Sequence, residues 1–146
     1  MKTLFLFLLI TGLSQAQITE IDLGESKQIG RVANSIECTR TQTPDFVFYI
    51  FRYKDSRYSS LNIHDSFTVG SDEDFHALYD KIIENFDKES KDNYVLDLNN
   101  GSILMINFDK IQKNSIRIGH VKNGVIMGLS GSLNKKKINI LFGKKN

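Results

Sequence analysis

Residues 71–88 (SDEDFHALYDKIIENFDK) are the one long segment with helical periodicity, and they limit the possible folds more than any other segment. Ser71 stands where an N-cap belongs, and Asp74 three residues later gives a variant of the capping box. The apolar residues recur at intervals of three and four and share one helix face: Phe75, Leu78, Tyr79, Ile82, Ile83 and Phe86. The opposite face is polar, so we predict an amphipathic helix over residues 72–88 that packs on a sheet.

Strand-like segments lie on both sides of this helix. Residues 46–53 (FVFYIFRY) are apolar or aromatic in both alternating sets of positions, which is typical of a central strand covered on both faces. A turn is expected just before it, around Pro44. The other strands predicted before the helix are a short one at 18–23, a long one at 29–42, and two short ones at 58–63 and 66–69 around a turn at His64 and Asp65.

The segments after the helix predict an antiparallel meander. Asn99-Asn100-Gly101 and Asn123-Gly124 each separate two apolar runs, and Asn-Gly favours a tight hairpin because both residues accept the positive φ of a type I′ turn. A last strand is predicted over residues 137–142 (KINILF). The fold class that follows is α+β: a strongly bent antiparallel sheet or partly open barrel of about 8–10 short strands, with one helix packed on it.

The first sixteen residues have the pattern of a secretory signal peptide. Lys2 precedes a short apolar run over residues 4–10, and Ser14-Gln15-Ala16 fits a cleavage site. The apolar run is shorter than the roughly 20 residues that span a bilayer, although a retained N-terminal anchor is the alternative. We therefore expect a single α+β domain over residues 17–146, secreted or periplasmic, with no membrane span after cleavage.

The charge of the chain gives no argument for a nucleic-acid partner. Nineteen lysines and arginines against seventeen acids leave a net charge of +2, and removal of residues 1–16 with their single lysine lowers it to +1. The basic clusters at residues 135–137 and 144–145 are interpreted as a solvated turn and tail.

Cys38 is the sole cysteine, which excludes an internal disulfide and a metal site built from cysteines. It lies in phase with Val32 and Ile36 on a strand-like run, so a buried and inert thiol is expected. The alternative is an intermolecular disulfide in an oxidising compartment.

The three histidines do not have the spacing of a metal site. His64, His76 and His120 are 12 and 44 residues apart, without the short paired spacings that ligating histidines use. His64 belongs to a turn, His76 to the polar helix face, and His120 to the end of a row of buried residues. The sequence assigns no catalytic residue, no metal site and no cofactor.

An aromatic cluster is the candidate binding surface. Tyr49, Phe51 and Tyr53 share one face of the central strand, and Tyr58 follows the next turn. Aromatic side chains with polar tips, with Arg52 and Arg57 nearby, are typical of ligand or partner surfaces. The alternative interpretation is a second small core on the sheet face away from the helix.

Three functions remain open from the sequence. The first is a non-catalytic binding or interaction module, a monomer or weak dimer, with an unidentified protein or small ligand as its partner outside the cytoplasm. The second is a small hydrolase that uses carboxylates or a lone histidine, which requires such groups to converge in a pocket. The third is a structural component of the envelope or matrix, which requires neither a pocket nor a patch.

Overall fold

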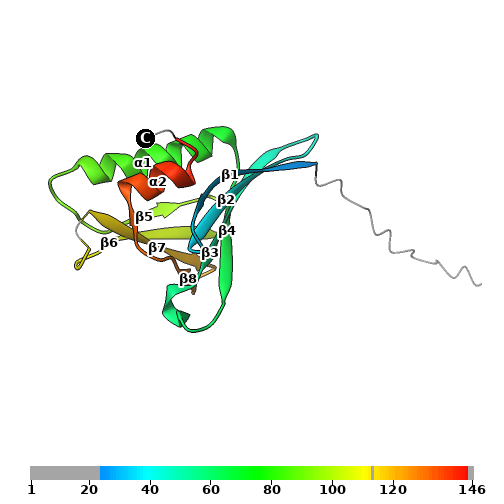
Figure 1. The fold of residues 1–146 in the computed structure, drawn as a ribbon. Helices are drawn as coiled ribbons and strands as arrows, with labels where there is room; N and C mark the ends of the chain where they lie inside the picture. Colours follow the sequence, from blue (N-terminus) through cyan, green and yellow to red (C-terminus); the bar gives the residue numbers. More distant parts are fainter. Residues whose placement is uncertain (1–23, 113, 145–146) are drawn as a thin grey trace, which may run out of the picture.

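The computed structural model describes residues 24–112 and 114–144. The predicted signal peptide, at residues 1–16, and the predicted first strand, at residues 18–23, lie outside the described residues. The fold consists of two antiparallel sheets and two α-helices (Figure 1).

The first sheet, sheet A, comes from the chain before the long helix. Its strands follow sequence order: β1 (Glu25–Val32), β2 (Ile36–Gln42), β3 (Val47–Lys54) and β4 (His64–Val69). A single turn of 3-10 helix, η1 (Ser56–Tyr58), lies between β3 and β4. The predicted central strand at 46–53 is confirmed as β3, because β2 and β4 pair with its two edges. The expectation that both its faces are covered is wrong, because only the face with Tyr49, Phe51 and Tyr53 is buried.

The second sheet, sheet B, comes from the chain after the long helix. Four strands lie in sequence order: β5 (Tyr94–Asp97), β6 (Ser102–Phe108), β7 (Ser115–Lys122) and β8 (Val125–Leu129). A fifth, β9 (Leu133–Asn134), pairs with the first residues of β7. The helices are α1 (Asp72–Asp87) and α2 (Lys135–Leu141).

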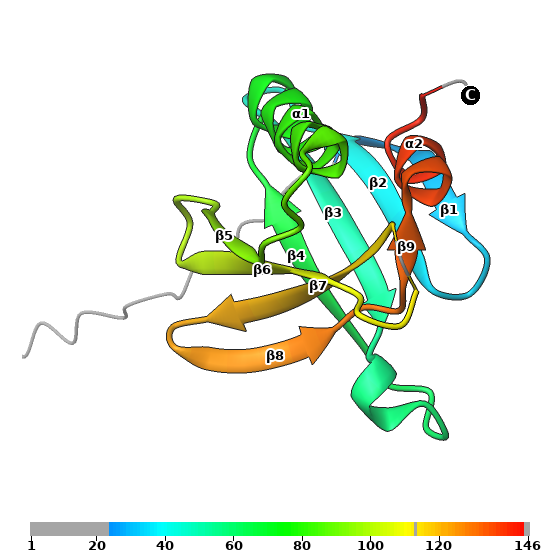
Figure 2. The same ribbon diagram turned by 90° about the vertical axis from the view of Figure 1, so that its left-hand side faces the viewer.

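The α+β class is confirmed, but the single bent sheet or partly open barrel is not. The nine strands of the described chain form two separate sheets whose strands run in clearly different directions, and the long helix α1 lies across them (Figure 2). No strand pair joins sheet A to sheet B in the described residues, so no closed barrel forms.

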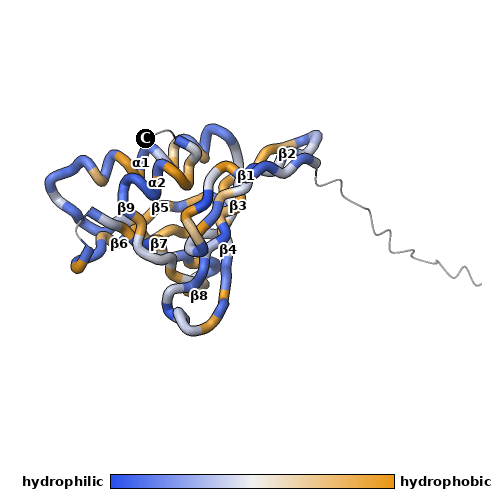
Figure 3. Tube along the Cα trace, in the orientation of Figure 1, coloured by the Kyte–Doolittle hydropathy of each residue, from blue (hydrophilic) through white to orange (hydrophobic). Residues whose placement is uncertain are grey.

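The predicted helix at 72–88 is confirmed as α1. The Ser71 hydroxyl accepts a hydrogen bond from the Asp74 N–H at 3.0 Å, as an N-cap does. The predicted stripe supplies its buried residues, Phe75, Leu78, Ile82 and Phe86. Hydrophobic residues recur at intervals along α1 in Figure 3, as this stripe requires.

One core joins both sheets and both helices. Tyr49 on β3 stacks on Phe75 of α1 with ring centroids 3.9 Å apart, and Phe86 near the other end of α1 meets Phe108 of β6 edge to face. Phe142, just after α2, packs against both Phe51 and Phe75. The long helix therefore covers residues from sheet A near its start and from sheet B near its end.

The long strand predicted at 29–42 is wrong, because the chain reverses within it. Ala33 adopts a positive φ of 43°, and the Ser35 N–H donates to the Val32 carbonyl at 2.9 Å, which closes a tight turn between β1 and β2. The strand predicted at 58–63 is also wrong. That segment contains the end of η1 and an irregular loop, and β4 begins at His64, where a turn was expected.

The last predicted strand, at 137–142, is wrong because residues 135–141 form α2. Asn134 caps this helix by accepting from the Lys137 N–H at 2.9 Å, and Gly143 follows it with a φ of +66°. Ile138 and Leu141 are buried three residues apart, which is helical spacing. A Cβ on Gly30 would lie 2.0 Å from the Ile140 carbonyl oxygen, so the bare backbone of β1 is what lets α2 approach.

The two hairpins predicted after the helix are present. Asn123 and Gly124 have φ values of 50° and 78°, and Lys122 pairs with Val125, as a two-residue type I′ turn requires. The β5–β6 connection is longer, because Asp97 pairs with Ile103 and Asn99 and Gly101 hold the positive φ values. Among the described residues, no helix combines the length and the apolar character needed to cross a membrane.

Candidate functional site

A polar hollow lies on the outer face of sheet A, at the end where the β1–β2 turn and the η1 loop approach each other. Its volume is about 540 Å³. One row of register partners crosses all four strands at this end: Arg31 on β1, Glu37 on β2, Arg52 on β3 and Ser66 on β4. The lining residues are Arg31, Ala33, Asn34, Ser35, Ile36, Glu37, Arg52, Lys54, Asn62 and His64. We call this site the basic hollow.

The charges in the basic hollow are unbalanced. Arg31, Arg52 and Lys54 face a single carboxylate, Glu37, which leaves a net charge of +2 with His64 counted as neutral. Glu37 lies between the two guanidinium groups at 3.9 Å from Arg31 and 3.8 Å from Arg52, and both arginine side chains remain more than half exposed. In the described residues the Lys54 ammonium has no ion pair. The cations are therefore only partly neutralised.

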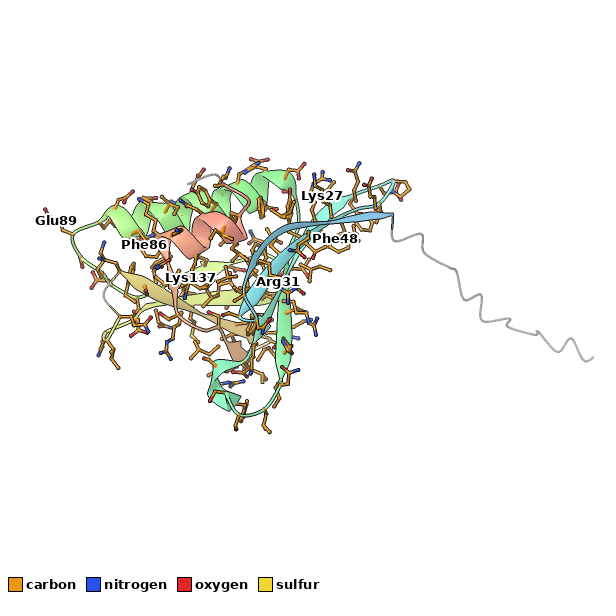
Figure 4. The ribbon with its side chains drawn as sticks, in the orientation of Figure 1. Lys27, Arg31, Phe48, Phe86, Glu89 and Lys137 are labelled. Atoms are coloured by element: carbon orange, nitrogen blue, oxygen red, sulfur yellow. The ribbon has the colours of Figure 1, made fainter. Side chains whose placement is uncertain are left out.

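The turn between β1 and β2 orients one of these arginines. Arg31 Nε donates to the Ala33 carbonyl at 3.0 Å, and Arg31 Nη2 donates to Asn34 Oδ1 at 3.4 Å. Figure 4 shows Arg31 on sheet A, away from Phe48, which lies nearer the opposite end of that sheet. The guanidinium is thus held at the wall of the hollow, and its remaining N–H groups can donate to a ligand.

The four residues predicted to bind a ligand are not gathered into one exposed surface. Tyr49, Phe51 and Tyr53 are buried on the face of β3 that looks toward α1, and only Tyr58 is exposed. The alternative interpretation, a small second core on the sheet face away from the helix, is wrong, because Tyr49 and Phe51 both contact Phe75 of α1. Their rings belong to the main core.

The polar tips of these tyrosines have partners inside the protein. The Tyr49 hydroxyl donates a short hydrogen bond to Asp72 at the start of α1, where Arg40 also pairs with the carboxylate. The Tyr53 hydroxyl lies 3.4 Å from Asp65 Oδ2. Burial, with Asp65 adding to it, raises the pKa of Tyr53 above its ordinary range.

His120 lies between a hydroxyl and a carboxylate. Its Nε2 atom is 3.2 Å from Ser102 Oγ, and its Nδ1 atom is 3.8 Å from Asp65 Oδ2, beyond hydrogen-bond distance. The order of groups matches that of a serine hydrolase. However, Ser102 and His120 are both buried, neither lines the basic hollow, and burial lowers the pKa of His120.

The other two histidines are exposed and lie on different elements. His64 lines the basic hollow, and His76 lies on the outer face of α1, next to Phe75. Across residues 24–112 and 114–144, no three side chains of His, Cys, Asp or Glu converge in a way that could hold a metal ion. The residues that line the basic hollow do not form such a group.

Most of the basic hollow was missed by the sequence analysis. Arg52 was noted only as a neighbour of the aromatic cluster, and Arg31, Glu37 and Lys54 were not singled out. The available signal was weak: charged residues stand at alternate positions on strand-like segments, where a solvated face is the ordinary interpretation. Only the strand register shows that they share one row.

Comparisons with known proteins give no relative. No model of a known protein family matches the chain, and no curated protein and no solved structure matches it significantly.

Proposed function

We propose that this protein is a small exported, non-catalytic binding module that holds an anionic ligand in the basic hollow. The observation that carries the proposal is the row Arg31–Glu37–Arg52, in which one carboxylate is shared by two half-exposed guanidinium groups, with the Lys54 ammonium nearby. Export is proposed from residues 1–16, whose pattern fits a secretory signal peptide.

The chemistry of the lining favours a carboxylate or phosphate group as the ligand. Guanidinium groups donate two parallel hydrogen bonds to such groups, and an ammonium adds a point charge. Amide groups from Asn34 and Asn62 line the same hollow and supply neutral donors. A volume of about 540 Å³ falls in the range of small-molecule sites.

A binding role is favoured over catalysis in this hollow because its acids do not form a working pair. Glu37 is the one carboxylate in the lining, and two arginines flank it. Glycoside hydrolysis by carboxylates needs two such groups at a defined separation. Here the single carboxylate competes with an anionic ligand for the same cations.

The test is a titration of the purified chain with inorganic phosphate and, separately, with citrate, followed by NMR chemical shifts at low salt. We expect the shifts to concentrate on residues that line the basic hollow. Arg52→Glu should weaken binding by at least about tenfold, because it removes one donor fork and adds a repulsive charge.

Lys27→Glu is the matched control, since it makes the same change of charge at an exposed position of β1 outside the lining. It should leave binding close to the wild type. Glu37→Gln should strengthen binding by up to about fivefold, the equivalent of one surface ion pair. Equal losses in Arg52→Glu and Lys27→Glu, or no saturable binding of either anion, would show the proposal to be wrong.

A second candidate function, a hydrolase, rests on the order Ser102, His120 and Asp65. It requires the buried Ser102 hydroxyl to meet a substrate. A small activated ester, p-nitrophenyl acetate, is the probe. Hydrolysis above the buffer rate that disappears in both Ser102→Ala and His120→Asn would favour this candidate, and a rate unchanged by either substitution would exclude these residues as its catalysts.

A further inference from the structure

The outer face of sheet B carries two rows of apolar residues. One row of register partners runs Val95, Met105, Gly119 and Leu129 across strands β5 to β8. The next row runs Ile103, Val121 and Ile126, with the acidic Asp97 at its β5 end. The core-facing residues of the same strands, such as Leu104, Ile106 and Ile118, are buried, so these rows face away from the core. We call them the outer rows.

The outer rows are exposed to solvent. Val95, Ile103 and Ile126 are 63%, 36% and 56% exposed, and Met105, Val121 and Leu129 are partly buried. A solvated sheet face ordinarily carries polar residues at these alternate positions. A contiguous apolar face of this kind is typical of a protein interface.

At the centre of the outer rows, the Met105 side chain covers Gly119 and can change its conformation. An added Cβ on Gly119 would lie 3.0 Å from Met105 Cε, so the methionine fills the space above the glycine backbone. An unbranched thioether can shift to match an opposing surface.

Two charges lie on opposite sides of Met105, one at the β5 end of the outer rows and one just beyond them on β7. Asp97 ends one row on β5, and Arg117 pairs with Asn107 in the row beyond Gly119 on β7. The diagonal between the two charges passes close to Met105, at the middle of the apolar face. Arg117 Nε binds Asp109, and the Arg117 side chain remains partly exposed. One acid and one base placed in this way make the face complementary to itself.

The edge of β8 next to this face is partly closed to strand addition. The Leu129 N–H donates to Asp55 Oδ1 at 3.3 Å, and Arg57 Nη2 donates to the Met127 carbonyl at 2.7 Å. Those backbone groups are therefore occupied, and a second chain cannot pair with them to extend the sheet. This favours face-to-face packing over pairing at that part of the β8 edge.

We propose that two copies of this chain form a symmetric dimer by packing their outer rows against each other. A twofold axis in the plane of the interface, crossing the diagonal near Met105, sets Asp97 of each copy opposite Arg117 of the other. Two apolar sheet faces packed in this way form a sandwich. The basic hollow lies on sheet A, outside this contact, so the proposal does not depend on the proposed function.

The test is sedimentation equilibrium of the purified chain over a range of protein concentrations. We expect a reversible monomer–dimer equilibrium. Ile126→Lys should raise the dissociation constant of the dimer at least about tenfold, because it buries an unpaired charge in the interface. Phe46→Lys is the matched control, because Phe46 has the same 56% exposure but lies just before β3 in sheet A. It should leave the equilibrium unchanged.

Asp97 and Arg117 give a second test. Asp97→Lys should also weaken the dimer, since it places two cations opposite each other, and adding Arg117→Glu should restore it. Thermal melting checks that Arg117→Glu, which leaves Asp109 beside a new acid, still folds. If it does not fold, Asp97→Lys alone decides. Thermal melting checks the fold of that variant too, because Asp97 Oδ1 accepts a hydrogen bond from the Asn99 N–H. A wild-type chain that stays monomeric at every concentration, or equal effects of Ile126→Lys and Phe46→Lys, would overturn the proposal.

Discussion

Cys38 and His120 owe their burial to the phase of the strands that carry them. Cys38 alternates with Ile36 on β2, and His120 alternates with Ile118 on β7, so both point into the core. Both positions were predicted from the spacing of their apolar neighbours. In each case burial disfavours the charged form of the side chain and shifts its pKa.

The Cys38 thiol should be inert in the folded protein. It is fully buried, and burial raises its pKa to about 12, so almost no thiolate forms at neutral pH. We expect no reaction with a disulfide reagent such as DTNB until the protein is unfolded in guanidinium, and then one thiol per chain. Rapid labelling of the native chain, or a dimer that dissociates when a reducing agent is added, would contradict the prediction of an inert thiol.

His120 should make stability depend on pH. Its folded-state pKa is lowered, mainly by burial, with Asp65 opposing and Lys122 adding to the shift. The unfolded chain therefore takes up a proton below about pH 6.5 before the folded chain does. The contribution of His120 to stability is thus complete above that pH and decreases as the pH falls toward the folded-state value.

Urea unfolding at pH 7.5 and at pH 5.5 measures this contribution. The wild type should lose unfolding free energy between the two values, and His120→Gln should lose less. His64→Gln is the control, because His64 is exposed. This variant should lose as much unfolding free energy between the two pH values as the wild type. An equal slope in His120→Gln and the wild type would contradict the prediction.

At the scale of elements, α1 shows how far local periodicity reaches. The spacing of Phe75, Leu78, Ile82 and Phe86 identified the helix, its buried face and its N-cap at Ser71 before any partner was known. α2 shows the limit. Its residues alternate like a strand, and they also fit helical spacing, so only the caps at Asn134 and Gly143 distinguish the two interpretations.

Ile82→Asp should unfold the domain. The side chain is almost fully buried between α1 and the sheets, so an aspartate there places an unpaired charge in the core at a cost of several kcal/mol. Ala77→Asp, at an exposed position of the same helix, should lose less than about 1 kcal/mol. Circular dichroism during thermal unfolding compares the two variants, and cooperative melting of Ile82→Asp at the wild-type temperature would refute the burial of this face.

At the scale of the whole molecule, an ion pair between a buried aspartate and an exposed arginine ties the two sheets together. Asp55, at the end of β3, pairs with Arg57 at 2.7 Å, and the two side chains bind the β8 backbone at Leu129 and Met127. The Arg57 hydrogen bonds are the main reason that the pKa of Asp55 is lowered despite its burial. No strand pairing joins the sheets within residues 24–112 and 114–144, so this contact supplements the shared core.

Asp55→Ala should destabilise the fold by roughly 1–3 kcal/mol, because it leaves the Leu129 N–H and part of the Arg57 guanidinium without a partner. Asp45→Ala, at an exposed position in the β2–β3 turn, is the control and should change stability by less than about 0.5 kcal/mol. Urea unfolding measures both, and hydrogen exchange should show faster exchange at β8 in Asp55→Ala alone. Equal exchange at β8 in the two variants would argue against this link.

The elements with local signals could be predicted from the sequence. These are the helix predicted at 72–88, the central strand predicted at 46–53 and the hairpin at Asn123-Gly124, because periodicity, capping and positive φ act within a few residues. The tertiary structure decided what these elements pack against. It split the strands into two sheets, turned Tyr49, Phe51 and Tyr53 into the core, and folded the last segment as α2.

The basic hollow and the outer rows were decided at the tertiary level as well. Arg31 and Arg52 are 21 positions apart in the chain, and Val95 and Leu129 are 34 apart, yet each pair belongs to one row of strand partners. Alternation along a strand reports which face a residue occupies, but not which residue of another strand lies beside it. Strand register sets that, and it depends on the packing of the whole chain.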